Sequence, residues 1–136
     1  MVPLPEFDLE ADNGIVQDKR YFGRRSSSGE PSRRQVTLIE REQISEHATA
    51  LGQDDFPPGI VRSNVETEGI SLVPLSGKQV KIGAAVLLIG APRDPCAQMD
   101  RIAPGLRERM DHGKQGVLAQ VLVSGKVRLG DPITVL

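Results

Sequence analysis

The sequence is poor in cysteine, in aromatic residues and in long apolar runs. It has one cysteine, Cys96, among 136 residues, no tryptophan, and only 3% aromatic residues. A single cysteine excludes an internal disulfide, so the sequence carries no sign of an oxidising compartment. With so few aromatic residues, the core must consist mainly of valine, isoleucine, leucine and alanine.

The sequence also lacks the features that a membrane or a nucleic acid as partner would require. No apolar run approaches the ~18–20 residues of a membrane-spanning helix, and the first residues lack the features of a signal peptide. The formal charge of −1 gives no reason to expect nucleic acid or an acidic membrane surface as a partner. We therefore expect a cytoplasmic protein. Its length and composition suit one compact domain.

Charge divides the N-terminal part of the chain into two segments. All the charged side chains of residues 1–13 are acidic. This predicts a flexible acidic arm before a single domain over residues 14–136. Residues 19–34 carry six basic side chains against Glu30 alone. The stretch 26–32 (SSSGEPS) cannot bury apolar area, so residues 24–33 are predicted to form a mobile loop.

The remainder is rich in short segments with β character. Apolar and β-branched stretches predict strands at 35–39, 79–82, 84–89, 116–123, 126–129 and 133–136, with Ser124-Gly125 as a hairpin turn. Ile44, Ala48 and Leu51 share one face of a helix over 41–51, and Pro104 suits the first position of a second helix over 104–110. Many short strands without βαβ alternation predict a mainly β fold, a β-barrel with two or more short attached helices.

Five segments then occur in a specific order. They are residues 14–21 (GIVQDKRY), 34–39 (RQVTLI), 59–65 (GIVRSNV) with Gly69-Ile70 after it, 92–99 (PRDPCAQM) and 125–132 (GKVRLGDP). Together they resemble the motifs of the MOSC domain family, related to the C-terminal domain of molybdenum cofactor sulfurases, in a small stand-alone bacterial form. Where many members have His-Gly-Gly, this chain has residues 31–34 (PSRR). The resemblance implies a MOSC-like β-barrel and a site centred on Cys96.

Cys96 and Arg93 are the candidate catalytic residues. A lone cysteine in a cytosolic protein is more often a small buried hydrophobe than a nucleophile. Here Arg93 lies three residues away, and a cation stabilises a thiolate, which is both a sulfur nucleophile and a soft metal ligand. The resemblance implies that Cys96 ligates molybdenum or carries sulfur.

Five further residues are candidates for holding the cofactor. Arg62 and Asn64, at i and i+2 of an expected strand, offer planar donors for a phosphate and an amide for a pterin edge; a surface ion pair and a turn asparagine are the common alternative. Asp18, Lys19 and Arg20 are weaker candidates, since a solvated turn explains them nearly as well. His47 and His112 are too scattered to predict a zinc site.

Three functions remain open from the sequence. In the preferred one the resemblance implies a bound molybdenum cofactor (molybdopterin), as in the mitochondrial amidoxime reducing component, which reduces N-hydroxylated substrates and requires an electron-transfer partner. In the second, Cys96 carries sulfur as a persulfide received from a cysteine desulfurase-type donor. In the third, the chain is a non-catalytic binding module whose cysteine is inert.

Overall fold

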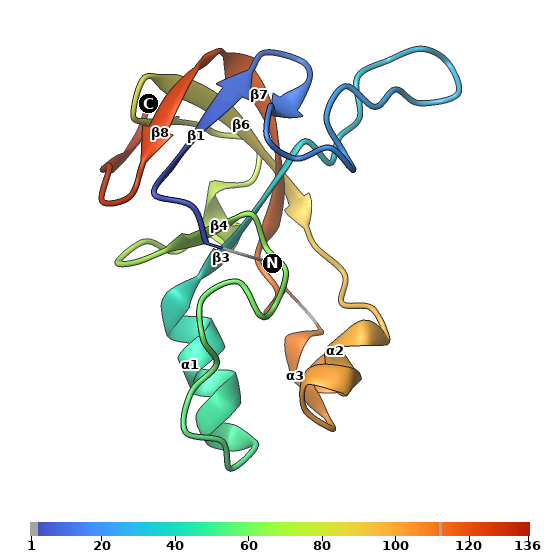
Figure 1. Ribbon diagram of the computed structural model, residues 1–136, viewed down its shortest axis with the longest axis vertical. Coiled ribbons are helices and arrows are strands. Elements are labelled where there is room, and N and C mark those ends of the chain that lie inside the picture. The colour runs from blue at the N-terminus through green and yellow to red at the C-terminus, as the bar shows by residue number, and fades with distance from the viewer. Residues whose placement is uncertain (1–2, 112) are drawn as a thin grey trace.

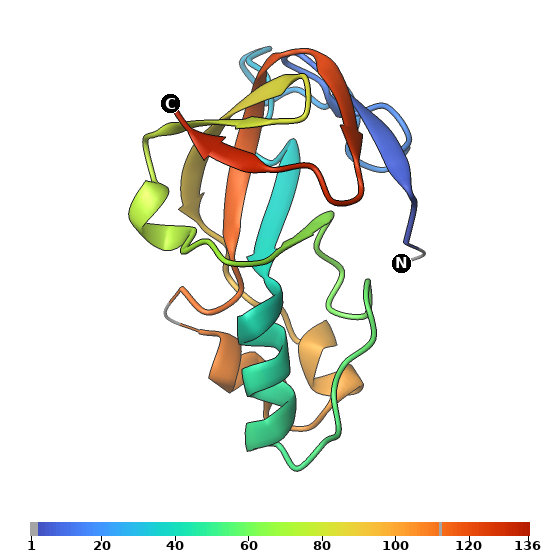
Figure 2. The ribbon, with the colours of Figure 1, turned by 90° about the vertical axis from the view of Figure 1, so that its left-hand side faces the viewer.

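Two curled β-sheets and three short helices make up the computed structural model, which describes residues 3–111 and 113–136 (Figure 1). The larger sheet has the strand order β4-β3-β7-β6-β5-β9, and the smaller has the order β2-β1-β8. The two sheets together form a half-barrel, with the helices gathered at one end (Figure 2). The predicted fold class, mainly β with short attached helices, is therefore confirmed. None of the helices in the described residues has the length and apolar character to span a bilayer.

The centre of the larger sheet was predicted from the sequence. The strands of this sheet are β3 (Val36–Glu40), β4 (Val65–Thr67), β5 (Gln79–Ile82), β6 (Ala85–Pro92), β7 (Val117–Val123) and β9 (Ile133–Val135). Strand β3 pairs parallel with β4 and antiparallel with β7. Side chains of Leu38, Leu87, Val117 and Val121 are fully buried between the sheets. This burial fixes the strand register, because a shift by one residue would turn these side chains to the other face.

The smaller sheet corrects two predictions. The acidic arm is not loose along its length, because Glu6–Glu10 forms strand β1, which pairs antiparallel with β8 (Gly125–Arg128) and β2 (Gly14–Ile15). Lys126 lies 3.6 Å from Glu6 and 3.3 Å from Asp8, so the partner strand compensates the acidic charge. The predicted hairpin at Ser124-Gly125 is wrong, because β8 leaves β7 and pairs with β1 in the other sheet.

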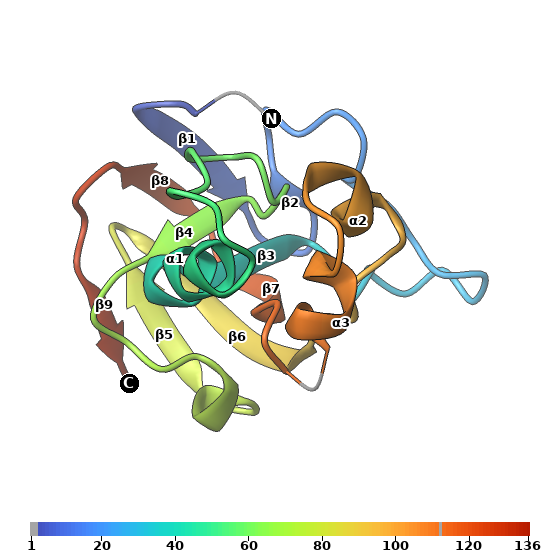
Figure 3. The ribbon, with the colours of Figure 1, turned by 90° about the horizontal axis from the view of Figure 1, so that it is seen from below.

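The helices form a second apolar cluster below the sheets (Figure 3). Helix α1 (Arg41–Ala50) confirms the helix predicted over residues 41–51, with Ile44 and Ala48 fully buried. The helix predicted over 104–110 is shorter than expected: α3 begins at Leu106 and ends at Met110, so Pro104 lies before the helix and not at its first position. Helix α2 (Gln98–Ile102) was not predicted.

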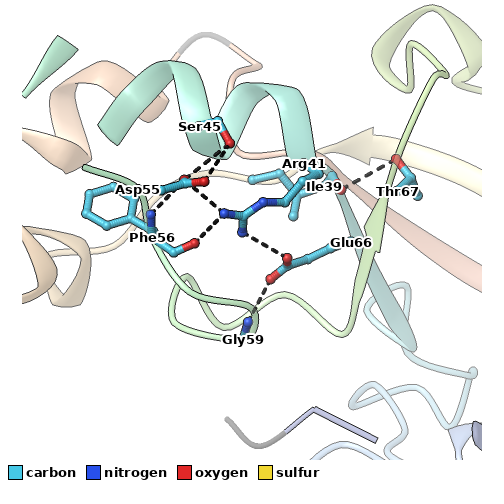
Figure 4. A network of polar contacts seen from close by, with 8 residues as sticks. All are labelled: Ile39, Arg41, Ser45, Asp55, Phe56, Gly59, Glu66 and Thr67. Atoms are coloured by element: carbon cyan, nitrogen blue, oxygen red, sulfur yellow. Dashed lines mark hydrogen bonds and ion pairs between the residues drawn. The ribbon is translucent and has the colours of Figure 1, made fainter. Parts of the chain in front are cut away.

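Arg41, the first residue of α1, ties this helix to the loop that follows it (Figure 4). Its guanidinium forms ion pairs with Asp55 at 2.9 Å and Glu66 at 3.2 Å and donates to the carbonyl of Phe56. Glu66 in turn accepts from the backbone nitrogen of Gly59 at 2.7 Å. These contacts hold residues 55–59 against the start of β4.

Residues 24–33 form an exposed loop that extends away from the sheets (Figure 1). A single backbone bridge pairs Arg25 with Pro31, and the guanidinium of Arg25 donates to the side chain of Asn13 at 2.9 Å. The base of this loop is thus attached to the turn between β1 and β2. The mobility predicted for the loop stays a prediction.

Candidate functional site

Cys96 lies in the short segment between the end of β6 and the start of α2. Its side chain is exposed. The segment is fixed at both sides: the backbone nitrogen of Arg93 donates to the carbonyl of Gly116 at 2.9 Å, and the carbonyl of Cys96 accepts from Met99, which is fully buried. The thiol is therefore presented to solvent from a backbone that both cores hold in place.

Arg93 is buried, with 7% of its surface exposed, and has no carboxylate partner among the described residues. Its Nη1 donates to the hydroxyl of Ser63 at 3.1 Å and to the carbonyl of Arg62 at 3.3 Å, while its Nε is buried without a partner. Burial lowers the pKa of Arg93 to about 10, and the charge of Arg34 acts in the same direction, whereas the electrostatic effect of Cys96 acts in the opposite direction. Arg93 and Cys96 thus lie within electrostatic range of each other.

Further arginines gather around Tyr21, which acts electrostatically on Arg93. The guanidinium carbons of Arg20, Arg24 and Arg34 lie 5.2, 5.5 and 4.7 Å from the centre of the Tyr21 ring, within the range of cation–π contacts. Tyr21, Arg34 and Arg62 all act electrostatically on Arg93. We call Arg20, Arg24, Arg34, Arg62 and Arg93 the arginine cluster.

The arginine cluster has no internal compensation. Within residues 3–111 and 113–136, none of its members forms an ion pair, and the Nε of Arg34, like that of Arg93, is buried without a partner. Like charges at short range repel, and buried charged groups without an opposite charge are costly. An anion beside Cys96 would relieve both penalties, so the arrangement is suited to binding one.

Arg62 and Asn64 do not lie on a strand, so the predicted geometry is wrong. Both belong to the loop before β4, which begins at Val65, and Arg62 has a left-handed backbone with φ of 62°. The structure brings Arg62 to the arginine cluster. Asn64 instead holds the loop to β3, because its Oδ1 accepts from the backbone nitrogen and the hydroxyl of Thr37 at 2.9 and 3.0 Å. Its predicted contact with a pterin stays a prediction.

The three weaker candidates lie in different surroundings. Arg20 is part of the arginine cluster. Asp18 accepts a hydrogen bond from the backbone nitrogen of Arg20 at 3.2 Å. This contact belongs to a turn, which was the alternative to cofactor binding for this residue. Lys19 is exposed, and no contact joins its side chain to Tyr21 or Cys96.

Sequence reasoning missed Tyr21, Arg24 and Arg34 as members of the site. The signal was present, because the basic run from residue 19 to residue 34 contains one tyrosine. Lys19 and Arg20 were predicted as candidates for holding the cofactor, but residues 24–33 were predicted only as a mobile loop. The sequence does not reveal that the run folds back toward Arg93. Among the described residues, no three histidine, cysteine or acidic side chains are grouped as metal ligands. His112 lies outside the described residues.

The half-barrel also contains a cavity. Its volume is about 990 Å³, and its walls include residues of β1, β4, β8 and β9. We call it the barrel cavity. Asp18, Ser63 and Asn64 line it, whereas Cys96 and the arginine cluster do not. Ser63, which accepts a hydrogen bond from Arg93 at 3.1 Å, connects the two features.

The chain belongs to the MOSC domain family, whose model matches residues 18–134. This match covers four of the five segments that carried the resemblance and, of the first, residues 18–21. No curated protein sequence matches the chain.

Solved structures share the fold. YuaD from Bacillus subtilis has a TM-score of 0.77 at 24% identity, over 97% of this chain and 85% of that chain. YiiM from Escherichia coli has a TM-score of 0.71 at 21% identity, over 96% of this chain and 62% of that chain. YiiM from Geobacillus stearothermophilus has a TM-score of 0.69 at 21% identity, over 78% of this chain and 56% of that chain. The chain thus spans about three fifths of the two YiiM proteins. At these identities the likeness concerns the fold alone.

Proposed function

We propose that this MOSC domain binds molybdenum cofactor at the arginine cluster, with the thiolate of Cys96 as the protein ligand of the metal. The observation that carries the proposal is the arginine cluster, whose five members form no ion pair among the described residues and one of which, Arg93, interacts electrostatically with the exposed Cys96. The family is associated with this cofactor, and the residues present fit its chemistry. We therefore treat the arginine cluster and Cys96 as one binding site.

The fit rests on the donors that the site offers. Arginine presents planar, bidentate donors that match a phosphate, and the Nε atoms of Arg34 and Arg93 are buried without partners. Tyr21 adds a flat ring with three guanidinium groups over it. In this proposal Arg34, Arg62 and Arg93 hold the anionic part of the cofactor, and Cys96 ligates molybdenum as a soft thiolate.

When bound, the cofactor would supply two-electron redox chemistry of the kind that reduces N-hydroxylated substrates, with electrons from a partner protein. The chain's own contribution is binding and orientation. Arg93, fixed through Gly116 and Ser63, holds its positive charge beside the thiolate of Cys96. Arg93 thus places a positive charge within electrostatic range of the sulfur that would ligate the metal.

The exposure of Cys96 favours a second candidate, a sulfur carrier. The Cys96 thiolate attacks the terminal sulfur of a donor persulfide, the donor's sulfur–sulfur bond breaks, and the donor leaves as a thiolate. The arginine cluster would stabilise the anionic persulfide left on Cys96.

Metal and pterin analysis of protein made in cells that synthesise the cofactor tests the proposal. We expect molybdenum and the fluorescent oxidised pterin in about equal amounts, and loss of molybdenum in Cys96→Ser. Absence of both from the wild-type protein would contradict cofactor binding. A mass increase of one sulfur atom on Cys96 without metal would favour the carrier. If Cys96→Ser retains all binding and activity, the chain is a non-catalytic binding module.

A further inference from the structure

The barrel cavity has the size and lining of a site for an organic molecule. Its volume of about 990 Å³ lies at the upper end of the range of about 300–1,000 Å³ for small-molecule sites. Ile82 and Val127, which are buried in the main core, line it together with the half-buried Ile133. The floor is therefore apolar and belongs to a rigid part of the sheets.

The charged side chains around this floor are mostly acidic. Four carboxylates and two arginines line the cavity: Asp18, Glu66, Glu68, Asp131, Arg41 and Arg128. Both arginines are already compensated, Arg41 by Asp55 and Glu66 and Arg128 by Glu6 at 3.3 Å.

Three of the carboxylates have no cation partner in the part of the chain that the structure describes. Asp18 and Asp131 accept only from the backbone nitrogens of Arg20 and Arg128, at 3.2 and 2.7 Å, and Glu68 is exposed without an ion pair. The cavity thus combines an apolar floor with an acidic rim, the opposite charge to that of the arginine cluster.

We propose that the barrel cavity binds an organic cation, an apolar body that carries an ammonium or amidinium group. The apolar body would lie on Ile82, Val127 and Ile133, where it leaves water. The positive group would lie among Asp18, Glu68 and Asp131, whose negative charges have no cation partner among the described residues. An anion of the same shape is disfavoured by these carboxylates. Cys96 and the arginine cluster do not line this cavity, so the proposal does not depend on the function of Cys96.

Three probes with the same phenylbutyl body test the charge preference: 4-phenylbutylamine (an ammonium at pH 7), the neutral 4-phenylbutan-1-ol and 4-phenylbutyrate. Each is titrated into ¹⁵N-labelled protein, and the backbone amide shifts of Thr67, Ile82 and Ile133 are followed by NMR. We expect the amine to bind roughly fivefold more tightly than the alcohol, as one or two exposed ion pairs allow, and the carboxylate to bind most weakly.

A charge-neutral rim variant locates the effect. Glu68→Gln combined with Asp131→Asn removes two charges and retains hydrogen-bonding groups, and it should lower the affinity for the amine about fivefold without changing that for the alcohol. The control is Glu46→Gln with Asp54→Asn, two exposed carboxylates outside the cavity with the same change in net charge. The control should bind the amine as the wild type does.

Ile70→Trp, which fills the cavity from its half-buried wall, should weaken all three probes. The rim variant changes only exposed or half-buried side chains, so the test does not depend on this core-side substitution folding. Equal binding of amine and carboxylate, an unchanged affinity in the rim variant, or no shift of the cavity amides by any probe would each overturn the proposal.

Discussion

Arg41 and Arg93 are both largely buried arginines, yet their surroundings differ. Arg41 has a side chain that is 19% exposed and contacts two carboxylates and a backbone carbonyl (Figure 4). Arg93 is more deeply buried and contacts only a hydroxyl and a carbonyl, with further arginines near it. Among the described residues, Arg41 is thus compensated by opposite charges and Arg93 is not.

This difference separates a stabilising cation from one that is available to a ligand. A buried charge without an opposite charge costs free energy that the rest of the fold must offset. Such a cost is tolerated where a ligand relieves it, and perturbed charges of this kind cluster at functional sites. The contrast therefore supports the arginine cluster as the site and the Arg41 network as part of the framework.

The largest effect is expected at the backbone anchor of Arg93. Gly116 has φ of 77°, and a Cβ there would overlap the carbonyl oxygen of Leu38. Gly116→Ala should lower the free energy of unfolding by about 3 kcal/mol or more, measured by urea denaturation. Gly29→Ala is the control, since Gly29 has φ of 85° but no atom near its Cβ position, and it should cost about 1 kcal/mol. Equal losses in the two variants would contradict the tight anchor.

Breaking the Arg41 network should have the next largest effect. Arg41→Met leaves Asp55 and Glu66 without their cation and should cost roughly 2–3 kcal/mol in urea unfolding, less than a fully buried pair because the site is partly exposed. Arg128→Met, which breaks an exposed pair with Glu6, should cost less than about 1 kcal/mol. If Arg41→Met lowers the free energy of unfolding no more than Arg128→Met does, the Arg41 network does not stabilise the fold more than an exposed ion pair.

Acid should weaken the same network. A hydrogen bond from the backbone nitrogen of Phe56, followed by Arg41, lowers the pKa of Asp55 below its usual value of 3.8. Because the pKa is lower in the folded state, the contribution is present above about pH 4 and is lost as the pH falls through the folded pKa. Asp55→Asn should therefore flatten the decline of thermal stability below pH 4, and Asp54→Asn should leave it unchanged. A decline that is the same in both variants would show that Asp55 does not contribute.

The smallest effect is expected where a cation is removed from the arginine cluster. Arg34→Met loses a cation–π contact with Tyr21 but also relieves repulsion with Arg93, so the free energy of unfolding should change by less than about 1 kcal/mol. Thermal and urea unfolding measure this directly. A loss as large as that of Arg41→Met would mean that Arg34 stabilises the fold in the manner of Arg41.

Local patterns predicted the parts of the fold that depend on local sequence. Strands β5 and β6 and helix α1 follow from alternation and from the spacing of Ile44 and Ala48. Strand β1 was missed because its carboxylates suggest solvation, and only the cations of β8 explain their presence in a sheet. The hairpin at Ser124-Gly125 was wrong because the pairing of β8 with β1 is decided by the whole half-barrel.

The residues of the candidate site also fall into two groups, those that the local sequence predicts and those that only the fold brings together. Cys96 and Arg93 could be found because a short motif contains both residues. Arg34 and Tyr21 come near Arg93 only when residues 19–34 fold back beside the segment after β6, although they precede Arg93 by 59 and 72 positions in the sequence. Asn64 was predicted to contact the cofactor, but its carbonyl oxygen already accepts hydrogen bonds from the hydroxyl and the backbone nitrogen of Thr37.

The most direct test of the arginine cluster is the pterin content of two double variants made in cells that synthesise the cofactor. Arg34→Gln with Arg62→Gln removes two members of the cluster, and Arg101→Gln with Arg107→Gln removes two exposed arginines of α2 and α3 outside it. We predict that the cluster variant retains less than about a tenth of the wild-type pterin, as a loss of about 1.4 kcal/mol or more in affinity implies at limiting cofactor, and that the control retains all of it. Equal pterin in the two variants would contradict the claim that the unpaired arginines bind the cofactor.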